Sequence, residues 1–514
     1  MTRQYDNYAD LITFSRSSSG TALRPISYGT ELVTNGTFDS DISGWTDIST
    51  GTADISYLSG TLSLNTINTS NRGQAEQAIT TQAGGVYFYT FTVTATAYIK
   101  IGTTSQGTNI VGATQYTAGT HTVSFVALSN STYLTFYSIS NTTTLDNISV
   151  KEVLFDQPNA PLTLFNHPAG IPRIEYDADG NVLGLLVEES RTNLVEYSND
   201  FANAYWSKSG TGVSVPVITA NSEVSLDGTQ NADKVEFPAV STVDTFSLVT
   251  KTFSSRAAGT YTFSVYLKGQ NGGETVYLTL SNAVPTTSTE CVLTTEWQRF
   301  DITTTIATTA TLYTNIGIDL RDPSESGQTA QTVYFYEALF ELGSFPTSAI
   351  PTAGATATRS ADVASIPVAD FGYNQSEGSW LMEWDTADTD SVVAKYILSS
   401  GTSARVMYNN AGTSAYYSFD GSAVSTYTAP TPITLDGSLI KAAYAENESG
   451  SSVAHTGVLG TGSVNSDLLP NYNSTYGWSI GNLNNNQGFL NGHIKSIKYF
   501  PRKLTAAQLQ ELTS

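Results

Sequence analysis

ELVTNGTFDSDISGW, residues 31–45, places a short apolar strand before a turn, a phenylalanine, a group of acids and a Gly-Trp pair. The chain repeats this arrangement as NLVEYSNDFANAYW at residues 193–206. A pattern that recurs at a long interval is typical of a duplicated structural module. The two stretches therefore predict two copies of one domain, each beginning with the same strand and entry turn.

The segments that follow each opening alternate apolar and polar residues and come in the same order. The first set is GVYFYTFTV, AYIKIG, THTVSFVAL, YLTFYSI and DNISVKEV, and the second is GTYTFSVYLKG, ETVYLTLSN, EWQRFDITTTI, LYTNIGIDL and TVYFYEALFEL. Period-2 strands separated by turns rich in Gly, Asn and Thr predict antiparallel sheets packed as a sandwich. We therefore expect two sandwiches, at residues 31–155 and 193–346.

Strand patterns also fill residues 363–514, which end in the helical segment LTAAQLQEL. In that segment Thr505 and Gln508 have the spacing of a capping box, and Leu504 and Leu509 have the spacing of a hydrophobic staple. The predicted fold class is all-β, with three β-sandwich domains in tandem and one short C-terminal helix. The remaining ranges are expected to be an N-terminal segment at 1–30, a hairpin connector at 156–192 and a linker at 347–362.

The composition restricts the partners. The chain has 23 basic and 45 acidic residues, a net charge of -22, and no cluster of Lys or Arg. Repulsion between this charge and phosphate groups argues against nucleic acid and anionic membrane surfaces as partners. No stretch approaches about 18 consecutive apolar residues, and the N-terminus has no signal-peptide pattern. We therefore expect no membrane insertion, and assembly in the cytoplasm without Sec export.

The sequence shows no motif for catalysis or metal binding. The four histidines, His121, His167, His455 and His493, are scattered and none has metal-ligand spacing from another His or Cys, so zinc is not expected. Cys291 lies in a strand-like run and is interpreted as a small buried hydrophobe, not as a nucleophile. Because a glycosidase needs only two suitably spaced carboxylates, glycan cleavage stays an alternative. We expect no enzymatic activity and no required cofactor.

Alternating aromatic residues are the candidates for ligand binding. Tyr87 and Tyr89, and similarly Tyr417 and Phe419, alternate along predicted strands. Flat rings on an exposed sheet face suit the apolar faces of sugars, and neighbouring Asn, Thr and Asp can hydrogen-bond hydroxyl groups. The alternative is that these rings form half of each core. The core is the expected place for Trp45, Trp206, Trp380 and Trp384.

Several segments resemble a recurrent arrangement in bacteriophage and prophage fibre or spike proteins. They are RIEYDADGNVLGLLVEESRTNLVEYSNDFANAYW, EWQRFDITTT, YEALFELGSFPTSAIPTAGATATRSADVASI and the closing GWSIGNLNNNQGFLNGHIKSIKYFPRKLTAAQLQELTS. The resemblance implies a carbohydrate-binding-module-like jelly roll followed by a laminin-G or concanavalin-like sandwich. In that family FSRSSSGT commonly leads directly into PRIEYD, whereas here the sequence of residues 31–155 intervenes. We therefore expect residues 1–30 and 156–192 to meet in space.

The first opening and LDNISVKEV are similar to the first and last strands of carbohydrate-binding modules of the galactose-binding-like group. In those modules an acid after the Phe and an acid in the last strand often help to hold a structural calcium ion. Asp39 and Asp146 match those acids, whereas the second copy has Ala202 and the rings around Phe335. The resemblance implies a calcium site in the first sandwich only, with solvated turn acids as the alternative.

These observations and the resemblance together lead to a functional hypothesis. We expect a phage virion protein, a tail or head fibre, spike or decoration, that binds host cell-surface polysaccharide without cleaving it. The N-terminal segment is expected to dock to other virion proteins, and the assembly is expected to be a homotrimer formed in the bacterial host cytoplasm. A purely structural capsid or tail component is the first alternative and a polysaccharide depolymerase is the second.

Overall fold

The computed structural model describes residues 12–514 except 283–287, 368–370, 375, 389–394, 401–403, 409–414, 420–423, 429–436, 448–449, 463–476 and 484–486. The chain forms two compact units. One unit is residues 24–162, and the other combines residues 1–23 with 163–514. The predicted all-β class is confirmed, because antiparallel sheets make up both units.

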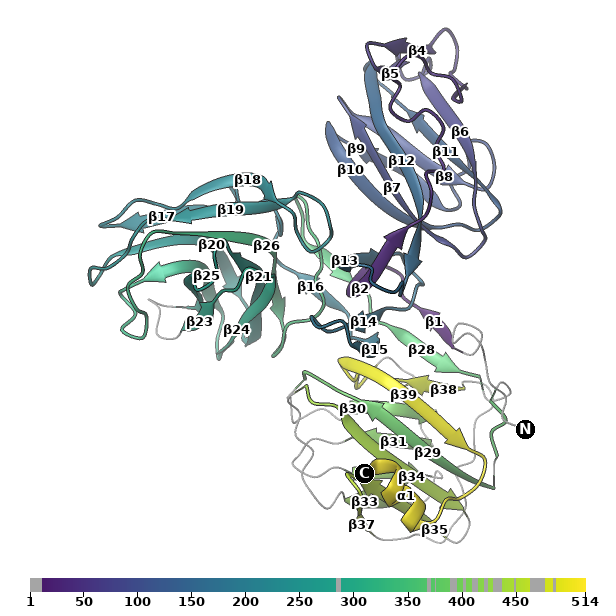
Figure 1. The fold of residues 1–514 in the computed structure, drawn as a ribbon, viewed down its shortest axis with the longest axis vertical. Coiled ribbons are helices and arrows are strands. Elements are labelled where there is room, and N and C mark those ends of the chain that lie inside the picture. Colours follow the sequence, from purple (N-terminus) through teal and green to yellow (C-terminus); the bar gives the residue numbers. More distant parts are fainter. Residues whose placement is uncertain are drawn as a thin grey trace. The chain divides into compact units, whose positions relative to one another are not determined.

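Residues 24–162 fold as a sandwich of two antiparallel sheets, here called the first sandwich (Figure 1). One sheet has the order β3 (Thr46–Asp47), β6 (Gln74–Thr80), β11 (Ser131–Tyr137), β8 (Ala97–Gly102) and β9 (Val111–Tyr116). The other joins β10 (Gly119–Val126), β7 (Val86–Val93), β12 (Thr143–Phe155), β5 (Thr61–Asn65) and β4 (Asp54–Leu58), and β12 also pairs with β2 (Gly20–Tyr28).

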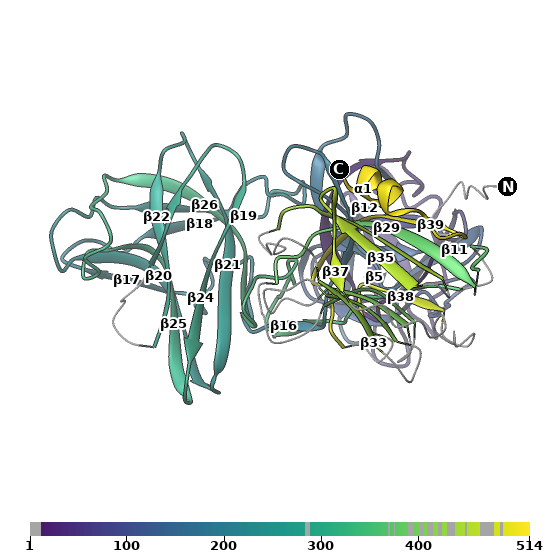
Figure 2. The ribbon, with the colours of Figure 1, turned by 90° about the horizontal axis from the view of Figure 1, so that it is seen from below.

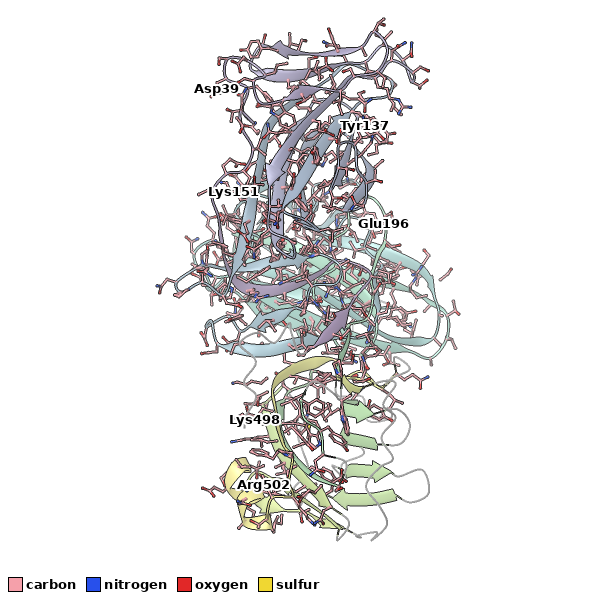
Figure 3. All side chains as sticks on the ribbon, turned by 90° about the vertical axis from the view of Figure 1, so that its right-hand side faces the viewer. Asp39, Tyr137, Lys151, Glu196, Lys498 and Arg502 are labelled. Atoms are coloured by element: carbon pink, nitrogen blue, oxygen red, sulfur yellow. The ribbon has the colours of Figure 1, made fainter. Side chains whose placement is uncertain are left out.

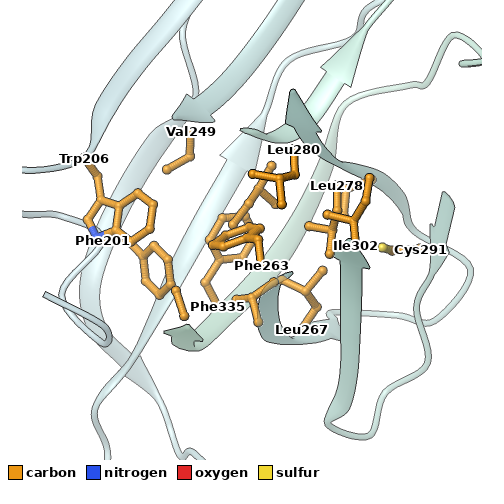
Figure 4. Packing of buried hydrophobic residues seen from close by; sticks show 14 of the residues in the cluster. Phe201, Trp206, Val249, Phe263, Leu267, Leu278, Leu280, Cys291, Ile302 and Phe335 are labelled. Atoms are coloured by element: carbon orange, nitrogen blue, oxygen red, sulfur yellow. The ribbon is translucent and has the colours of Figure 1, made fainter. Parts of the chain in front are cut away.

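The second sandwich repeats this architecture (Figures 1 and 2). Its first sheet has the order β17 (Ser207–Thr211), β20 (Phe246–Arg256), β25 (Ala310–Asp319), β22 (Thr275–Ser281) and β23 (Ser288–Val292). Its second sheet has the order β18 (Val217–Glu223), β19 (Ala232–Phe237), β26 (Gln331–Leu342), β21 (Gly259–Gly269) and β24 (Gln298–Ile306). Rings and aliphatic side chains fill the space between the two sheets (Figure 4).

The single cysteine belongs to this core. Cys291 is fully buried beside the aliphatic residues of the second sandwich (Figure 4). Burial raises the pKa of its thiol to about 12. A thiol that stays protonated is a poor nucleophile, so the interpretation of Cys291 as a small buried hydrophobe is confirmed.

The two opening stretches build the same local structure. In the first sandwich the indole Nε1 of Trp45 donates to the carbonyl of Asn35 at 3.2 Å, and in the second Trp206 donates to the carbonyl of Tyr197 at 2.9 Å. Each tryptophan also contacts a neighbouring phenylalanine of the core. The prediction that both tryptophans are core residues is confirmed, and so is the same prediction for Trp380 and Trp384.

A polar side chain ties each opening strand to the last strand of its sandwich. Glu31 Oε1 accepts from the backbone N–H groups of Val33 and Val150, both at 2.9 Å. Asn193 Oδ1 accepts from two backbone N–H groups at the matching positions, at 3.0 and 3.1 Å. The repeat in sequence therefore reflects a repeated way of closing the sandwich.

The third sandwich takes strands from three parts of the chain. Its eight-stranded sheet has the order β1 (Thr13–Ser15), β28 (Val363–Ile366), β38 (Trp478–Ile480), β30 (Lys395–Ser400), β31 (Ala404–Tyr408), β32 (Ala415–Phe419), β33 (Val424–Thr428) and β37 (Thr461–Gly462). Its seven-stranded sheet has the order β14 (Ile174–Tyr176), β15 (Val182–Val187), β39 (Gly492–Phe500), β29 (Glu377–Trp384), β34 (Ile440–Asn447), β35 (Gly450–His455) and β36 (Val458–Leu459). The N-terminal segment and the connector thus supply β1, β14 and β15 to a domain that we expected to lie wholly within residues 363–514.

Two short strands form a separate sheet, and one further strand comes directly after the first sandwich. β16 (Arg191–Asn193) pairs with β27 (Ala357–Arg359), so the chain enters and leaves the second sandwich at one place. β13 (Leu162–His167) follows the first sandwich.

One helix is found among the described residues, α1 (Ala506–Thr513). Thr505 is its N-cap, and Thr505 and Gln508 form the predicted capping box. Leu504 and Leu509 are buried in a small apolar cluster with residues of β29, β34 and β35. No helix in the described part of the chain is long and apolar enough to span a membrane.

Candidate functional site

The outer face of the five-stranded sheet in the first sandwich gathers polar and aromatic side chains. Strand register aligns two rows across β6, β11 and β8, namely Glu76, Thr135 and Lys100, and Gln74, Tyr137 and Tyr98. Residues between these rows, such as Ala75 and Phe136, are buried in the core, so strand alternation turns the rows to the opposite side. We call this surface the tyrosine face and define it by Arg72, Gln74, Glu76, Tyr98, Lys100, Gln115, Thr135 and Tyr137.

Two stacked tyrosines form the centre of the tyrosine face. The rings of Tyr98 and Tyr137 lie 5.0 Å apart between centroids with an interplanar angle of 21°. Tyr137, labelled in Figure 3, is only 7% exposed, whereas Tyr98 is half-buried. Tyr98 Oη donates to Gln115 Oε1 at 2.7 Å. Tyr137 therefore supports Tyr98, and Tyr98 is the ring that solvent and ligands can reach.

Two cations lie over the inner ring. Lys100 Nζ is 4.7 Å and the Arg72 guanidinium carbon 5.8 Å from the Tyr137 centroid. Burial lowers the pKa of Lys100, Arg72 lowers it further, and Glu76 opposes both. Burial also raises the pKa of Tyr137. The face thus combines an accessible ring with charged groups in a partly dry environment, where electrostatic interactions are stronger than in water.

Glu76 shapes one side of the face. Its Oε2 accepts from the backbone N–H of Gln106 at 2.7 Å and from Thr135 Oγ1 at 2.8 Å. The first bond holds the β8–β9 loop, in which Gln106 has a positive φ of 56°. A buried carboxylate with two donors has a fixed geometry, so the loop edge of the tyrosine face is held in place.

The tyrosines expected to bind sugar lie elsewhere. Tyr87 and Tyr89 are 2% and 0% exposed and pack in the core of the first sandwich, so the prediction that they form a surface site is wrong and the core alternative is correct. The reason is that the alternate face of β7 on which they lie is turned towards the opposite sheet. Tyr417 and Phe419 belong to β32, but their side chains lie outside the described residues.

The two acids assigned to calcium are separate in their contacts. Asp39 is exposed in the turn after Phe38 and is labelled in Figure 3. Asp146 accepts from the backbone N–H of Asn147 at 2.7 Å and from Asn147 Nδ2 at 3.1 Å, so both of its oxygens are engaged by one neighbour. Among the described residues no group of three or more His, Cys, Asp or Glu side chains could hold a metal ion. These contacts do not fit a shared ligand set, and calcium binding stays a prediction.

A buried charge cluster joins the N-terminal segment, the connector and the linker. Arg16 Nη1 pairs with Asp362 at 3.0 Å, Arg173 pairs with Glu188 at 2.7 Å and with Asp362, and Arg359 pairs with Glu188 at 3.3 Å. Arg16 also donates to the carbonyl oxygens of residues 167 and 168. Burial disfavours the charge on Glu188, but Arg359 and Arg173 lower its pKa well below the usual range.

This cluster explains three short motifs, FSR at residues 14–16, PRIEYD at residues 172–177 and TRSAD at residues 358–362. Each motif contributes one arginine, and the TRSAD motif also contributes Asp362. Breaking such a buried network leaves unpaired charges, which is strongly destabilising. The motifs therefore hold together the segments that complete the third sandwich.

A cavity of about 230 Å³ lies beside this cluster. His493 at its wall contacts Asp385 through Nδ1 and Glu175 through Nε2, both at 2.8 Å. Burial lowers the pKa of His493, but the hydrogen bonds to Asp385 and Glu175 outweigh it and raise the pKa to about 10. The protonated ring thus lies between two carboxylates that the sequence separates widely, and no spacing rule could have revealed this trio.

No protein-family model matches the chain, and no curated protein matches it. Solved structures with similarity include the module TmCBM61 in complex with beta-1,4-galactotriose, at 16% identity over 29% of this chain and 97% of that one, with a TM-score of 0.22. The tandem CBM22 domains of Paenibacillus barcinonensis Xyn10C match at 12% identity over 63% and 99%, with a TM-score of 0.22. Domains LG4-5 of the mouse laminin alpha1 chain match at 11% identity over 58% and 96%, with a TM-score of 0.18. TM-scores this low add nothing to the sandwich architecture that strand pairing already shows.

Proposed function

We propose that this protein binds glycans through the tyrosine face of the first sandwich, without cleaving them. The observation that supports the proposal is the accessible ring of Tyr98, stacked on Tyr137 and bordered by Lys100 and Gln115. A sugar ring presents C–H groups to an aromatic face and hydroxyl groups to its edges. The tyrosine face offers a partner for each.

A site of this kind is weak as a single copy. One half-buried ring and a few polar groups provide little more than millimolar to micromolar affinity, of the order of 4–8 kcal/mol. Repetition of the site on a multimeric particle raises the effective affinity by about 10²–10⁴-fold without new contacts. The proposal therefore fits a protein displayed in several copies on one particle.

The wider proposal is a bacteriophage virion protein, a tail or head fibre, spike or decoration, that attaches to host polysaccharide. Its support is the resemblance of the segments within residues 156–514 to fibre and spike proteins. Docking to other virion proteins through the N-terminal segment, and assembly as a homotrimer in the host cytoplasm, belong to the same proposal. A purely structural virion component is the alternative if no glycan is bound.

The test compares Tyr98→Ala with Tyr57→Ala. Tyr57 is 42% exposed on β4 of the same sandwich and lies outside the tyrosine face, so it is a matched control. Retention of the full-length protein on immobilised bacterial surface polysaccharide should fall about tenfold for Tyr98→Ala, the loss of roughly 1.4 kcal/mol expected for a stacking ring. Tyr57→Ala should bind like the parent protein. Equal retention of all three proteins would reject the site.

A depolymerase is the second candidate, and the cavity beside His493 is the observation that favours it. Three carboxylates, Glu175, Glu188 and Asp385, line that cavity, and glycan hydrolysis requires a pair of them. Glu175 and Asp385 both contact His493 at 2.8 Å, so each is already engaged by a side chain of the protein. Reducing ends released from the polysaccharide by the parent protein, and not by Glu175→Gln, would establish cleavage in place of adhesion.

A further inference from the structure

We propose that the tyrosine face selects an acidic glycan, one with a carboxylate or phosphate group on the sugar bound at Tyr98. This inference rests on the proposed glycan-binding function and specifies its ligand class.

Basic residues are scarce in residues 24–162. This unit has four of them, Arg24, Arg72, Lys100 and Lys151, against nine acidic residues. The one ion pair formed in this fully described unit joins Arg24 to Asp156, with Nη2 and Oδ2 at 2.5 Å. Arg72 and Lys100 are thus two of the three basic residues without an ion pair, and both lie over the ring of Tyr137.

Two cations that approach the same ring repel each other. Burial lowers the pKa of Lys100 most, repulsion from Arg72 lowers it further, and Glu76 opposes both without restoring the usual value. Arg72 is also held in place, because its Nε donates to the carbonyl of Thr69 at 2.6 Å. The first sandwich has few basic residues, so chance does not readily account for two of them lying close together. Their position indicates that both attract a bound, negatively charged group.

The one acid of the tyrosine face, Glu76, forms no ion pair with these cations within this fully described unit, although its charge partly offsets their repulsion. Glu76 makes its two hydrogen bonds through Oε2, to Gln106 and Thr135. Both cations are half-buried, neither sealed nor fully solvated. A carboxylate or phosphate on a sugar bound at Tyr98 would attract Lys100 and Arg72, which both approach the Tyr137 ring on which Tyr98 is stacked.

The second sandwich offers an internal comparison. The positions that match Glu76, Thr135 and Lys100 in register are Thr250, Asn315 and Thr279. Neither a positive nor a negative charge remains in that row. Selectivity for an acidic glycan is therefore assigned to the first sandwich alone.

The experiment measures binding of the full-length protein to three probes: polygalacturonate, the same polymer after chemical reduction of its carboxyl groups, and phosphorylated mannan. The expected result is preference for a charged polymer over the reduced one, and affinity that weakens as sodium chloride is added. Binding of polygalacturonate alone identifies a carboxylate, and binding of the mannan identifies a phosphate.

The variants separate this inference from glycan binding itself. Lys100→Gln should reduce affinity for the charged polymer about tenfold, as loss of a charge-assisted contact does, while Lys100→Arg retains most of it. Lys151→Gln, on β12 of the other sheet, removes the same charge and should have no effect. Equal binding of charged and reduced polymers, still lost in Tyr98→Ala, would overturn the acidic preference and leave glycan binding intact. If Tyr98→Ala also binds normally, both proposals are wrong.

Discussion

The first and second sandwiches share their internal structure and differ on their outer faces. Both close the opening strand with an indole N–H bond and a side-chain bond to the last strand. On the outer face Tyr277 matches Tyr98 in register, but Tyr277 is 3% exposed, and its Oη contacts Glu290 and the backbone N–H of Ser326. The duplicated scaffold therefore kept its core contacts and not its surface chemistry.

One backbone position explains why the outer faces diverged. Gly317 occupies the place of Tyr137, next to Ile316 as Tyr137 is next to Phe136. Gly317 has φ of 148°, and a Cβ atom there would lie 2.3 Å from the carbonyl oxygen of Ser247. No side chain fits, so the second sandwich cannot form the ring pair of the tyrosine face.

The largest effect should come from the shared core. Trp45→Ala and Trp206→Ala should each reduce the free energy of unfolding by about 3–5 kcal/mol, because each removes a large buried ring and its hydrogen bond. Chemical denaturation with separate probes for each sandwich would measure both. A small loss for one of them would show that the two openings are not equivalent.

The glycine that distinguishes the faces should tolerate no side chain. Gly317→Ala should destabilise the second sandwich by about 2 kcal/mol or more, since the added methyl group meets backbone atoms. Gly112→Ala is the control in β9 of the first sandwich, where nothing lies within 4 Å of the added atom, and it should be neutral or slightly stabilising. Equal thermal stability of the two variants would contradict the steric explanation.

A titratable group distinguishes the last strands of the two sandwiches. Both strands have a bulge residue with positive φ, Asn147 in the first and Glu337 in the second. Burial raises the pKa of Glu337 from 4.5 to about 8. A raised carboxyl pKa means that protonation favours folding, so this contribution is full below pH 4.5 and is lost as pH rises through about 8.

The second sandwich should therefore lose stability between about pH 4.5 and 8 through Glu337. The first sandwich should show no such loss at this position, because the side chain of the matching residue, Asn147, does not titrate. Thermal unfolding of the parent protein and of Glu337→Gln across this range would measure the difference. Glu337→Gln should flatten the dependence and raise the melting temperature near pH 8. An unchanged profile would mean that Glu337 stays charged in the fold.

The smallest effect should come from single hydroxyl groups. Tyr98→Phe removes the hydrogen bond to Gln115 and should weaken glycan retention about two- to fivefold, whereas Tyr277→Phe, in the second sandwich, should leave it unchanged. Retention on immobilised polysaccharide measures both. A loss for Tyr277→Phe would move the binding face to the second sandwich.

Sequence patterns predicted the architecture well because the features that set it are local. Alternation along strands, the repeated opening and the capping residues of α1 are all readable within a few residues. The tyrosine face was not predicted, because it depends on packing between residues that are far apart in the sequence. VYFYTFTV has a dense run of rings, but period-2 alternation says only that a strand has two faces and not which of them meets the opposite sheet.

The sequence by itself determined three sandwiches, a duplicated module and a closing helix, since local periodicity and turn chemistry specify such elements. Only the tertiary structure decided that Tyr98 in β8, and not Tyr89 in β7, reaches the surface. Tertiary structure also decided that β1, β14 and β15 belong to the third sandwich, and that Arg16, Arg173 and Asp362 meet. These outcomes depend on pairing between residues far apart in the chain. Burial of apolar faces and of paired charges determines which residues pair, and local sequence patterns do not predict it.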